Sequence, residues 1–314
     1  MSDIAVFSGS AHPELAAEIC ALLQIPLSPT RIERFASDCL EVQLMDNCRE
    51  RDVFIVQPLC APVQENLVEL LLMLDAARGA SAARRTVVMP HYAYGRSDKK
   101  DRPRISIGGR LVADLIATAG ADRVLAMTLH APQVHAFFSV PVDHLHALSL
   151  LAEHFAGENL TNTVVVSPDL GNAKEAAAFA RMLGVGVALA AKQRISDERV
   201  VISAIIGDVE GRDIIVLDDE IARGTSITEL LDHLAPRNVG RVRVVCTHGL
   251  FAAGALARLQ ARDDIEAIIC TNTVPIPEAE WPPKLTVLSV APAFAEAIRR
   301  IHNGESVSAL FHQG

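Results

Sequence analysis

The sequence predicts an α/β protein in which parallel sheets are covered by helices. Short runs rich in β-branched residues alternate with amphipathic segments of helical period, which is the pattern of a parallel sheet flanked by helices. The chain has 314 residues, of which 50% are hydrophobic and 4% aromatic, so it can bury a sizeable core. Its length favours about two domains.

Each expected element follows from its own local pattern. The strands are short apolar runs, and we expect them, in chain order, at 4–9, 52–57, 85–90, 123–128, 163–169, 213–220, 241–247 and 266–272. The helices have apolar residues three and four positions apart, and we expect them at 13–23, 65–80, 107–120, 148–157, 172–184, 226–235, 252–261 and 294–304. The last helix ends at Gly304 after His and Asn, which is typical of a C-cap.

The best candidate for a linker is the polar stretch at 157–162. It follows the helix expected at 148–157, and the strand–helix pattern starts again directly after it, at Thr163. We therefore expect a domain boundary between residues 147 and 162.

Charge and hydropathy exclude several classes of function. The formal net charge is −9 and the sequence pI is about 5.7, so no global positive field is present to hold nucleic acid or an anionic membrane. The first residues carry an acid before a short apolar run, whereas a secretory signal has a basic start and a longer apolar run. No apolar stretch is long enough to cross a bilayer. We expect a soluble, cytoplasmic protein whose anion-binding sites are local.

The cysteines are expected to be reduced, and most of them to lie in the core. No CxxC pair occurs, and no cysteine clusters with histidines at zinc-ligand spacing. A chain of this size needs no disulfide for stability. The six positions are Cys20, Cys39, Cys48, Cys60, Cys246 and Cys270.

The most specific local pattern is IIVLDDEIARGTSI, at 214–227. An apolar strand runs into Asp218 and Asp219, and a short loop with Thr225 and Ser226 leads into a helix. The start of a helix favours phosphate, and hydroxyl groups add donors. Two adjacent carboxylates at the end of a buried strand call for sugar hydroxyls or a hydrated Mg²⁺. The alternative is an acidic turn with an ordinary helix N-cap, and spacing alone does not separate the two.

A second segment concentrates positive charge in an otherwise acidic protein. Five cations fall within nine positions after the apolar strand at 85–90, and such a focus suits a triphosphate. The alternative is a solvated charged loop. The five residues are Arg96, Lys99, Lys100, Arg102 and Arg104.

Other candidate groups follow strand ends. Taken alone, His130 is more often a structural residue at such a position, and Asp169 after Ser-Pro is an ordinary N-cap or turn residue. Lys192 and Arg194 follow an apolar run at spacing two, so one face of an extended segment can present both to one anion. The alternative for this pair is an exposed strand end. We interpret the other nearby histidines, His135, His144 and His146, as structural or exposed.

Together these segments resemble the ribose-phosphate pyrophosphokinase family over nearly the whole chain. The loop from Asp218 to Ser226, called the DD-to-GTS loop below, is by itself also similar to the phosphoribosyl-binding loop of type I phosphoribosyltransferases. The longer segments VVMPHYAYGRSDKKD, TLHAPQVHAFFSVPVD, SPDLGNAK and AKQR resemble family segments in the same order, as do FSGSAHPELA, VCTHGLF, CTNTVP and RRIHNGESVSALF. The resemblance implies two similar type I phosphoribosyltransferase-like domains, each a mainly parallel sheet flanked by helices. It places them at 1–147 and 148–290, with 291–314 packing back on the first.

The resemblance also implies a Mg²⁺-dependent enzyme that moves the diphosphoryl group of ATP onto the 1-hydroxyl of ribose 5-phosphate. Lys192 and Arg194 are the implied catalytic cations, at the base of a mobile loop whose polar segment 195–201 closes over the site. The implied metal ligands are His130 and Asp169. The implied ATP-binding residues are Phe35, Arg96, Ser97, Lys99, Asp101 and His130. The implied ribose 5-phosphate-binding residues are Asp218, Asp219, Ala222, Arg223, Gly224, Thr225 and Ser226.

Several positions depart from the family pattern. Cys39 stands where an acid usually helps to hold adenine across a subunit contact. Asn172 replaces a usual glycine, and Ala222 and Arg223 replace small polar or acidic residues. Ser97 stands where Gln is common. These changes bear on nucleotide preference and sugar-phosphate affinity, and they leave the metal-binding and cationic groups in place.

Two other functions share part of the pattern. A phosphoribosyltransferase would use the DD-to-GTS loop but has no need of the GRSDKKD segment. A non-catalytic regulatory homologue would bind nucleotide and assemble with an active enzyme, but it has no chemical need for His130, Asp169, Lys192 and Arg194 together. Family members assemble as homo-oligomers, often hexamers, so the resemblance implies a dimer-based homo-oligomer.

Overall fold

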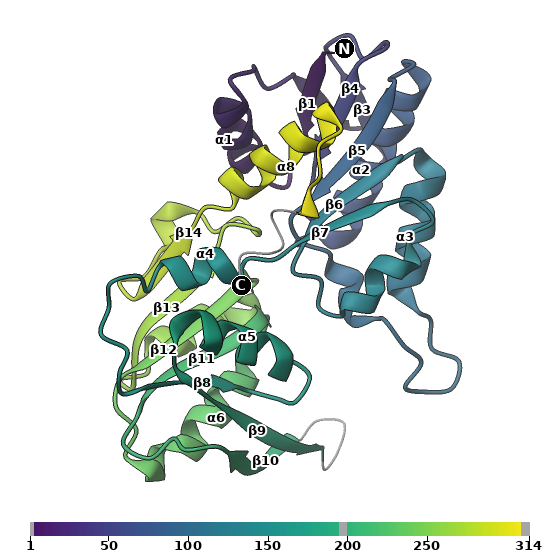
Figure 1. The fold of residues 1–314 in the computed structure, drawn as a ribbon. Helices are drawn as coiled ribbons and strands as arrows, with labels where there is room; N and C mark the ends of the chain where they lie inside the picture. The colour runs from purple at the N-terminus through teal and green to yellow at the C-terminus, as the bar shows by residue number, and fades with distance from the viewer. Residues whose placement is uncertain (1–2, 195–199, 309–314) are drawn as a thin grey trace. The chain divides into compact units, whose positions relative to one another are not determined.

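The computed structural model describes residues 3–194 and 200–308, and it confirms the α/β fold class. The chain forms two compact units. Within the described residues, the first unit contains 3–146, 273–275 and 290–308, and the second contains 147–272 and 276–289. Each unit has one main sheet of its own (Figure 1).

The first unit is built on a five-stranded sheet in which every neighbouring pair of strands is parallel. All of β4 is buried, and so are the last four residues of β5, which explains their continuous apolar runs in the sequence. In spatial order the strands are β1 (Ile4–Ser8), β4 (Asp52–Val56), β5 (Arg84–Met89), β6 (Arg123–Met127) and β7 (Val142–Leu145).

The last helix of the chain packs on the first unit. Figure 1 shows α8 beside α1, although the two lie at opposite ends of the sequence. The buried carboxylate of Asp52, at the start of β4, accepts a hydrogen bond from Arg84 Nε and lies 2.9 Å from His302 Nδ1 on α8. The helices of this unit are α1 (Pro13–Leu23), α2 (Val63–Gly79), α3 (Gly108–Ala119) and α8 (Ala291–Asn303).

An antiparallel hairpin of β2 (Thr30–Arg34) and β3 (Leu40–Leu44) was not among the predicted elements. Each strand alternates half-buried with exposed positions, and many of the exposed positions carry charge. Such strands have no continuous apolar run to reveal them. The hairpin packs through β3 against α2.

The second unit is built on a seven-stranded sheet. Its neighbouring strands are parallel except for β10, which runs antiparallel to β9 at one edge. In spatial order the strands are β10 (Val200–Ile206), β9 (Gly186–Arg194), β8 (Thr163–Ser167), β11 (Asp213–Ile221), β12 (Val242–Gly249), β13 (Ile265–Thr271) and β14 (Leu285–Leu288). The helices are α4 (Leu148–Glu153), α5 (Ala173–Leu183), α6 (Thr225–Leu234) and α7 (Ala255–Gln260).

One predicted helix starts later than expected. The pattern predicted a helix from residue 252, but α7 begins at Ala255. Phe251 and Ala253 have positive φ values of 42° and 53°, so the segment before α7 cannot be regular α-helix. The segment forms a 3₁₀ turn, η4 (Ala252–Gly254), instead.

All six cysteines lie within the described residues and are free thiols, as predicted. Five are buried and Cys39 is exposed. Across the part of the chain that the structure describes, no helix is both long and apolar enough to cross a membrane.

Candidate active site

The paired acids of the DD-to-GTS loop lie near the carboxyl end of β11. Asp218 and Asp219 are half-buried, and Asp218 Oδ1 accepts a hydrogen bond of 3.0 Å from the backbone N–H of Asp219. Asp218 pairs in register with Cys246 on β12, where burial raises the pKa of the thiol well above its ordinary value. Asp218 therefore lies beside a neutral thiol.

Helix α6 starts directly after the loop with an open N-terminus. Gly224 is the N-cap residue and has left-handed backbone angles (φ 69°, ψ 4°) that favour glycine. Glycine has no side chain with which to cap the first turn, so the N–H groups at the start of α6 can bind an anion. Thr225 is exposed and Ser226 is half-buried at this position. The predicted role of this loop in binding the sugar phosphate stays a prediction.

The loop before α6 is held by an arginine that the sequence pattern did not reveal. Arg258 on α7 donates from Nη2 to the carbonyl oxygen of Arg223 (2.7 Å) and from Nη1 to that of Ala253 (2.5 Å). Since the carbonyl oxygen of Arg223 lies 35 residues away in the chain, nothing local in the sequence predicts that contact. The side chain of Arg223 itself is exposed, and Ala222 is half-buried.

The turn that carries Asp169 is at the same edge of the sheet as Asp218 and Asp219, near the carboxyl end of β11. Strand β8 pairs in parallel with β11, so the turn after β8 lies next to the acids after Leu217. Asn172 donates from its side chain to the carbonyl oxygen of Leu217 (3.0 Å), and its backbone N–H donates to Asp169 Oδ1 (3.2 Å). Asn172, which departs from the family pattern, therefore joins the two acidic segments. The structure brings the Asp169 turn and the DD-to-GTS loop together.

Lys192 and Arg194 lie in the last residues of β9. This strand is parallel to β8, with Leu189 paired to Ser167, so its end reaches the same edge of the sheet. The backbone therefore places β8, β9 and β11 with their carboxyl ends side by side. The predicted loop at 195–201 falls mostly on residues 195–199, which lie outside the described residues.

In the first unit, the cationic segment is a loop closed at its base. Ser97 Oγ accepts a hydrogen bond of 2.8 Å from the N–H of Gly108, and the Ser97 carbonyl oxygen accepts one of 3.0 Å from Gly109. These bonds fix the loop between η1 (Ala93–Arg96) and α3. The predicted ATP-binding role of Ser97 is untested, and its hydroxyl is engaged in the loop. The exposed residues of the segment include Arg96, Lys99, Lys100, Asp101, Arg102 and Arg104.

His130 lies beside this segment, just after β6. A Cβ added to Gly95 would lie only 3.4 Å from the Cβ of His130, so η1 and His130 are packed closely. Thr128 has a φ of 42°, which is an outlier for a β-branched residue and marks a strained strand end. The next N–H, of Leu129, donates to His144 Nε2 (2.8 Å). His144 therefore has the structural role predicted for it, and it fixes the backbone that presents His130.

Phe35 lies in the turn of the β2–β3 hairpin. Its side chain is 49% exposed, and its N–H donates to the carbonyl oxygen of Cys39 (2.9 Å). Cys39 is exposed in the same turn. An exposed aromatic ring can stack on a base, and the ATP-binding role of Phe35 stays a prediction.

The described residues contain no cluster of three or more His, Cys, Asp or Glu side chains that could hold a metal ion by itself. The two predicted ligands belong to different units, His130 to the first and Asp169 to the second. Mg²⁺ commonly binds through one or two carboxylates, with waters and substrate phosphates completing its shell. A single half-buried carboxylate at Asp169 fits that mode of binding.

The fold defines an α/β protein of two units, each built on its own sheet, in which helix α6 begins beside paired acids with no side-chain cap. Residues 4–120 match the family described as the N-terminal domain of ribose phosphate pyrophosphokinase. Residues 191–312 match the phosphoribosyl synthetase-associated domain.

Full-length relatives agree with both matches. The chain is 71% identical over 311 residues to a putative ribose-phosphate pyrophosphokinase of Streptomyces coelicolor, covering 99% of this chain and 98% of the relative. It is 48% identical over 315 residues to ribose-phosphate pyrophosphokinase of Deinococcus radiodurans, with the same coverage. The crystal structure of phosphoribosylpyrophosphate synthetase from Mycobacterium smegmatis matches with a TM-score of 0.90 and 37% identity, over 96% of this chain and 100% of that one. The chain belongs to the ribose-phosphate pyrophosphokinase family.

Proposed function

We propose that this protein is a ribose-phosphate diphosphokinase, which converts ATP and ribose 5-phosphate into AMP and 5-phospho-ribose 1-diphosphate. The observation that carries the proposal is the likeness to ribose-phosphate pyrophosphokinases along the full length, at 48% and 71% identity. Two features of the chain support the proposal: an exposed cationic loop, which suits a polyphosphate, and a helix N-terminus beside paired acids, which suits a sugar phosphate.

In the proposed reaction, the 1-hydroxyl oxygen of the sugar attacks the β-phosphorus of ATP. The bond between that phosphorus and the α–β bridging oxygen breaks, AMP leaves with the oxygen, and the hydroxyl proton passes to solvent. No protein nucleophile is needed, so catalysis rests on positioning and on stabilising charge. Lys192, Arg194 and Arg96 are proposed to neutralise the charge that develops on the phosphates.

The sugar is proposed to bind at the DD-to-GTS loop. Asp218 and Asp219 would accept hydrogen bonds from its hydroxyl groups, and the residues from Ala222 to Ser226 would hold its 5-phosphate at the start of α6. On the nucleotide side, Lys99, Asp101 and Ser97 belong to the loop proposed for the polyphosphate, and Phe35 is proposed to stack on the base.

The divalent cation is proposed to be Mg²⁺, held by His130 and Asp169 together with substrate phosphates. When bound, it would neutralise charge on the polyphosphate. We further propose that the protein acts in the cytoplasm as a homo-oligomer built from dimers, as its resemblance to the family implies.

The test is to incubate the purified chain alone with ATP, ribose 5-phosphate and Mg²⁺ and to measure AMP. A diphosphokinase forms AMP and the sugar diphosphate in equal amounts. A phosphoribosyltransferase would consume added 5-phospho-ribose 1-diphosphate and form no AMP. A regulatory homologue would form none unless an active partner were added, and either result would contradict the proposal.

A further inference from the structure

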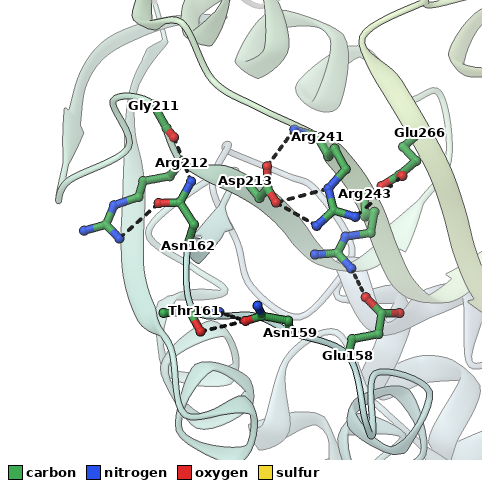
Figure 2. Close-up of polar contacts among 10 residues, drawn as sticks. All are labelled: Glu158, Asn159, Thr161, Asn162, Gly211, Arg212, Asp213, Arg241, Arg243 and Glu266. Atoms are coloured by element: carbon green, nitrogen blue, oxygen red, sulfur yellow. Dashed lines mark hydrogen bonds and ion pairs between the residues drawn. The ribbon is translucent and has the colours of Figure 1, made fainter.

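A second site candidate lies in the second unit, at the opposite end of β11 from the paired acids. There a cavity of about 550 Å³ opens between β12, β13 and the segment that follows α4. Its volume is within the range of small-molecule sites. Arg241, directly before β12, and Arg243, within it, both line the cavity, and because they are two residues apart they lie on the same face of the sheet (Figure 2).

Arg243 is the unusual member of this pair. It is only 4% exposed, it donates from Nη1 to Glu158 Oε2 (2.5 Å), and its guanidinium carbon lies 5.1 Å above the ring of Phe155. Its Nε and Nη2 atoms are buried and have no acceptor. These two N–H groups share one edge of the guanidinium, which is the fork that binds the two oxygens of a carboxylate. A buried charged fork without an acceptor is costly, and a ligand that supplies two oxygen atoms would relieve that cost.

Arg241 provides the contrast within the same structure. Its backbone N–H, Nε and Nη2 all donate to Asp213, at 2.9, 3.1 and 2.9 Å. Burial acts to raise the pKa of Asp213, but the hydrogen bonds and the charge of Arg241 outweigh it and lower the pKa. Arg241 is therefore already paired with a carboxylate, as Figure 2 shows. Of the two arginines, Arg243 is the one whose side chain has N–H groups without an acceptor.

The charges around the cavity select the kind of ligand. Two guanidinium groups face three carboxylates, of Asp213, Glu158 and Glu266, the last 3.9 Å from Arg241. A further anion is disfavoured unless one carboxylate leaves. Glu158 is the one able to leave, because its side chain is 42% exposed and meets Arg243 through one atom pair. Replacing it by a monocarboxylate keeps the charge constant, whereas a phosphate dianion adds a negative charge.

We propose that this cavity binds a small organic monocarboxylate, which takes the fork of Arg243 in exchange for the Glu158 side chain. Neither fork atom is in contact with solvent. Glu158 holds Arg243 through Nη1, outside the fork, so its release frees the guanidinium to turn and present the fork to the ligand. The body of the ligand would contact the apolar part of the lining, formed by Phe155, Ala267 and Ile269. No group of the proposed active site takes part.

The test measures the binding of benzoate to the full chain by saturation-transfer NMR. Benzyl alcohol, which has a similar shape but no charge, is the control. Benzoate is expected to bind and benzyl alcohol is not. The Arg243→Lys variant keeps the charge but loses the fork, and it should weaken benzoate binding at least about tenfold. The Glu158→Gln variant removes the internal competitor, and it should strengthen binding about twofold to fivefold.

Thermal unfolding of each variant shows whether it is folded. Arg243→Lys is expected to weaken benzoate binding and Glu158→Gln to strengthen it. If Arg243→Lys does not fold, Glu158→Gln alone still tests the proposal. Equal benzoate binding in the wild type and in Arg243→Lys would overturn the proposal, as would weaker binding in Glu158→Gln. Displacement of benzoate by an equal concentration of inorganic phosphate would overturn the preference for a carboxylate. None of these measurements depends on AMP formation.

Discussion

At the scale of single residues, the groups expected to do chemistry were easier to predict than the groups that hold them in place. Acids and cations after strands stand out in the sequence, because charge is rare next to buried apolar runs. Asn172, Arg258 and His144 hydrogen-bond to backbone atoms of segments far away in the chain. Such contacts depend on the fold and leave no local pattern.

Lys192 is the residue whose charge the proposed reaction needs most. Replacing it in Lys192→Ala should lower kcat by two or more powers of ten, since one group that stabilises transition-state charge supplies about 3–4 kcal/mol. Steady-state assay of AMP formation measures the effect. Lys284→Ala is the matched control, because Lys284 donates to the carbonyl oxygen of Arg262 elsewhere in the second unit. A mild loss of kcat in Lys192→Ala would refute the role.

Asn172 is expected to matter through the two acidic segments that it joins. Asn172→Ala removes the hydrogen bond to Leu217, so it should cost about 1 kcal/mol of unfolding free energy. It should also raise the KM for ribose 5-phosphate about fivefold, because the Asp169 turn and the Asp218 segment lose their common anchor. Asn159→Ala, which removes a local cap on Thr161, is the control and should leave KM unchanged. A KM unaffected by Asn172→Ala would contradict the positioning role.

At the scale of elements, the sequence predicted the buried parallel strands and the helices well, because their apolar runs and helical periods are strong signals. It missed the β2–β3 hairpin, the short strands β7 and β14, and the neighbouring strands β9 and β10. The residues of β2, β3, β7 and β14 are largely exposed or half-buried, so they form no continuous apolar run. It also could not show that β8, β9 and β11 are neighbours, since strand order depends on packing. That order is what gathers the Asp169 turn and the paired acids at one edge.

Helix α8 offers a test of how the stability of the fold depends on pH. Glu296 accepts hydrogen bonds from Arg299 and Arg300, which lower its pKa from 4.5 to about 2. An acid whose pKa is lowered by folding stabilises the fold above its unfolded pKa. That contribution is lost as the pH falls from about 4.5 towards 2.

Glu296→Gln should therefore be less stable than the wild type at pH 6, by about 0.5–1 kcal/mol, because the ion pairs of this half-buried side chain are still partly screened by solvent. The difference should shrink as the pH falls below 4.5. Thermal unfolding at a series of pH values measures both effects, with the exposed Glu210→Gln as control. A difference that stays constant down to pH 2 would show that the ion pairs do not stabilise α8.

At the scale of the whole molecule, the net charge of −9 is combined with local segments that are predicted to bind anions. One unit carries the cationic loop beside His130, and the other carries the open N-terminus of α6 beside paired acids. The resemblance over the whole chain was needed to choose among functions, because the DD-to-GTS loop alone fits both a diphosphokinase and a phosphoribosyltransferase. The full-length relatives favour the first of these.

The central claim is that the β- and γ-phosphoryl groups of ATP move together to the sugar. The direct measurement is the fate of radioactive phosphorus when the chain is supplied with ribose 5-phosphate and either [γ-³²P]ATP or [α-³²P]ATP. We predict that the γ-label appears in the sugar diphosphate and the α-label in AMP. A γ-label released as inorganic phosphate, or found in a sugar monophosphoryl product together with ADP, would contradict the account.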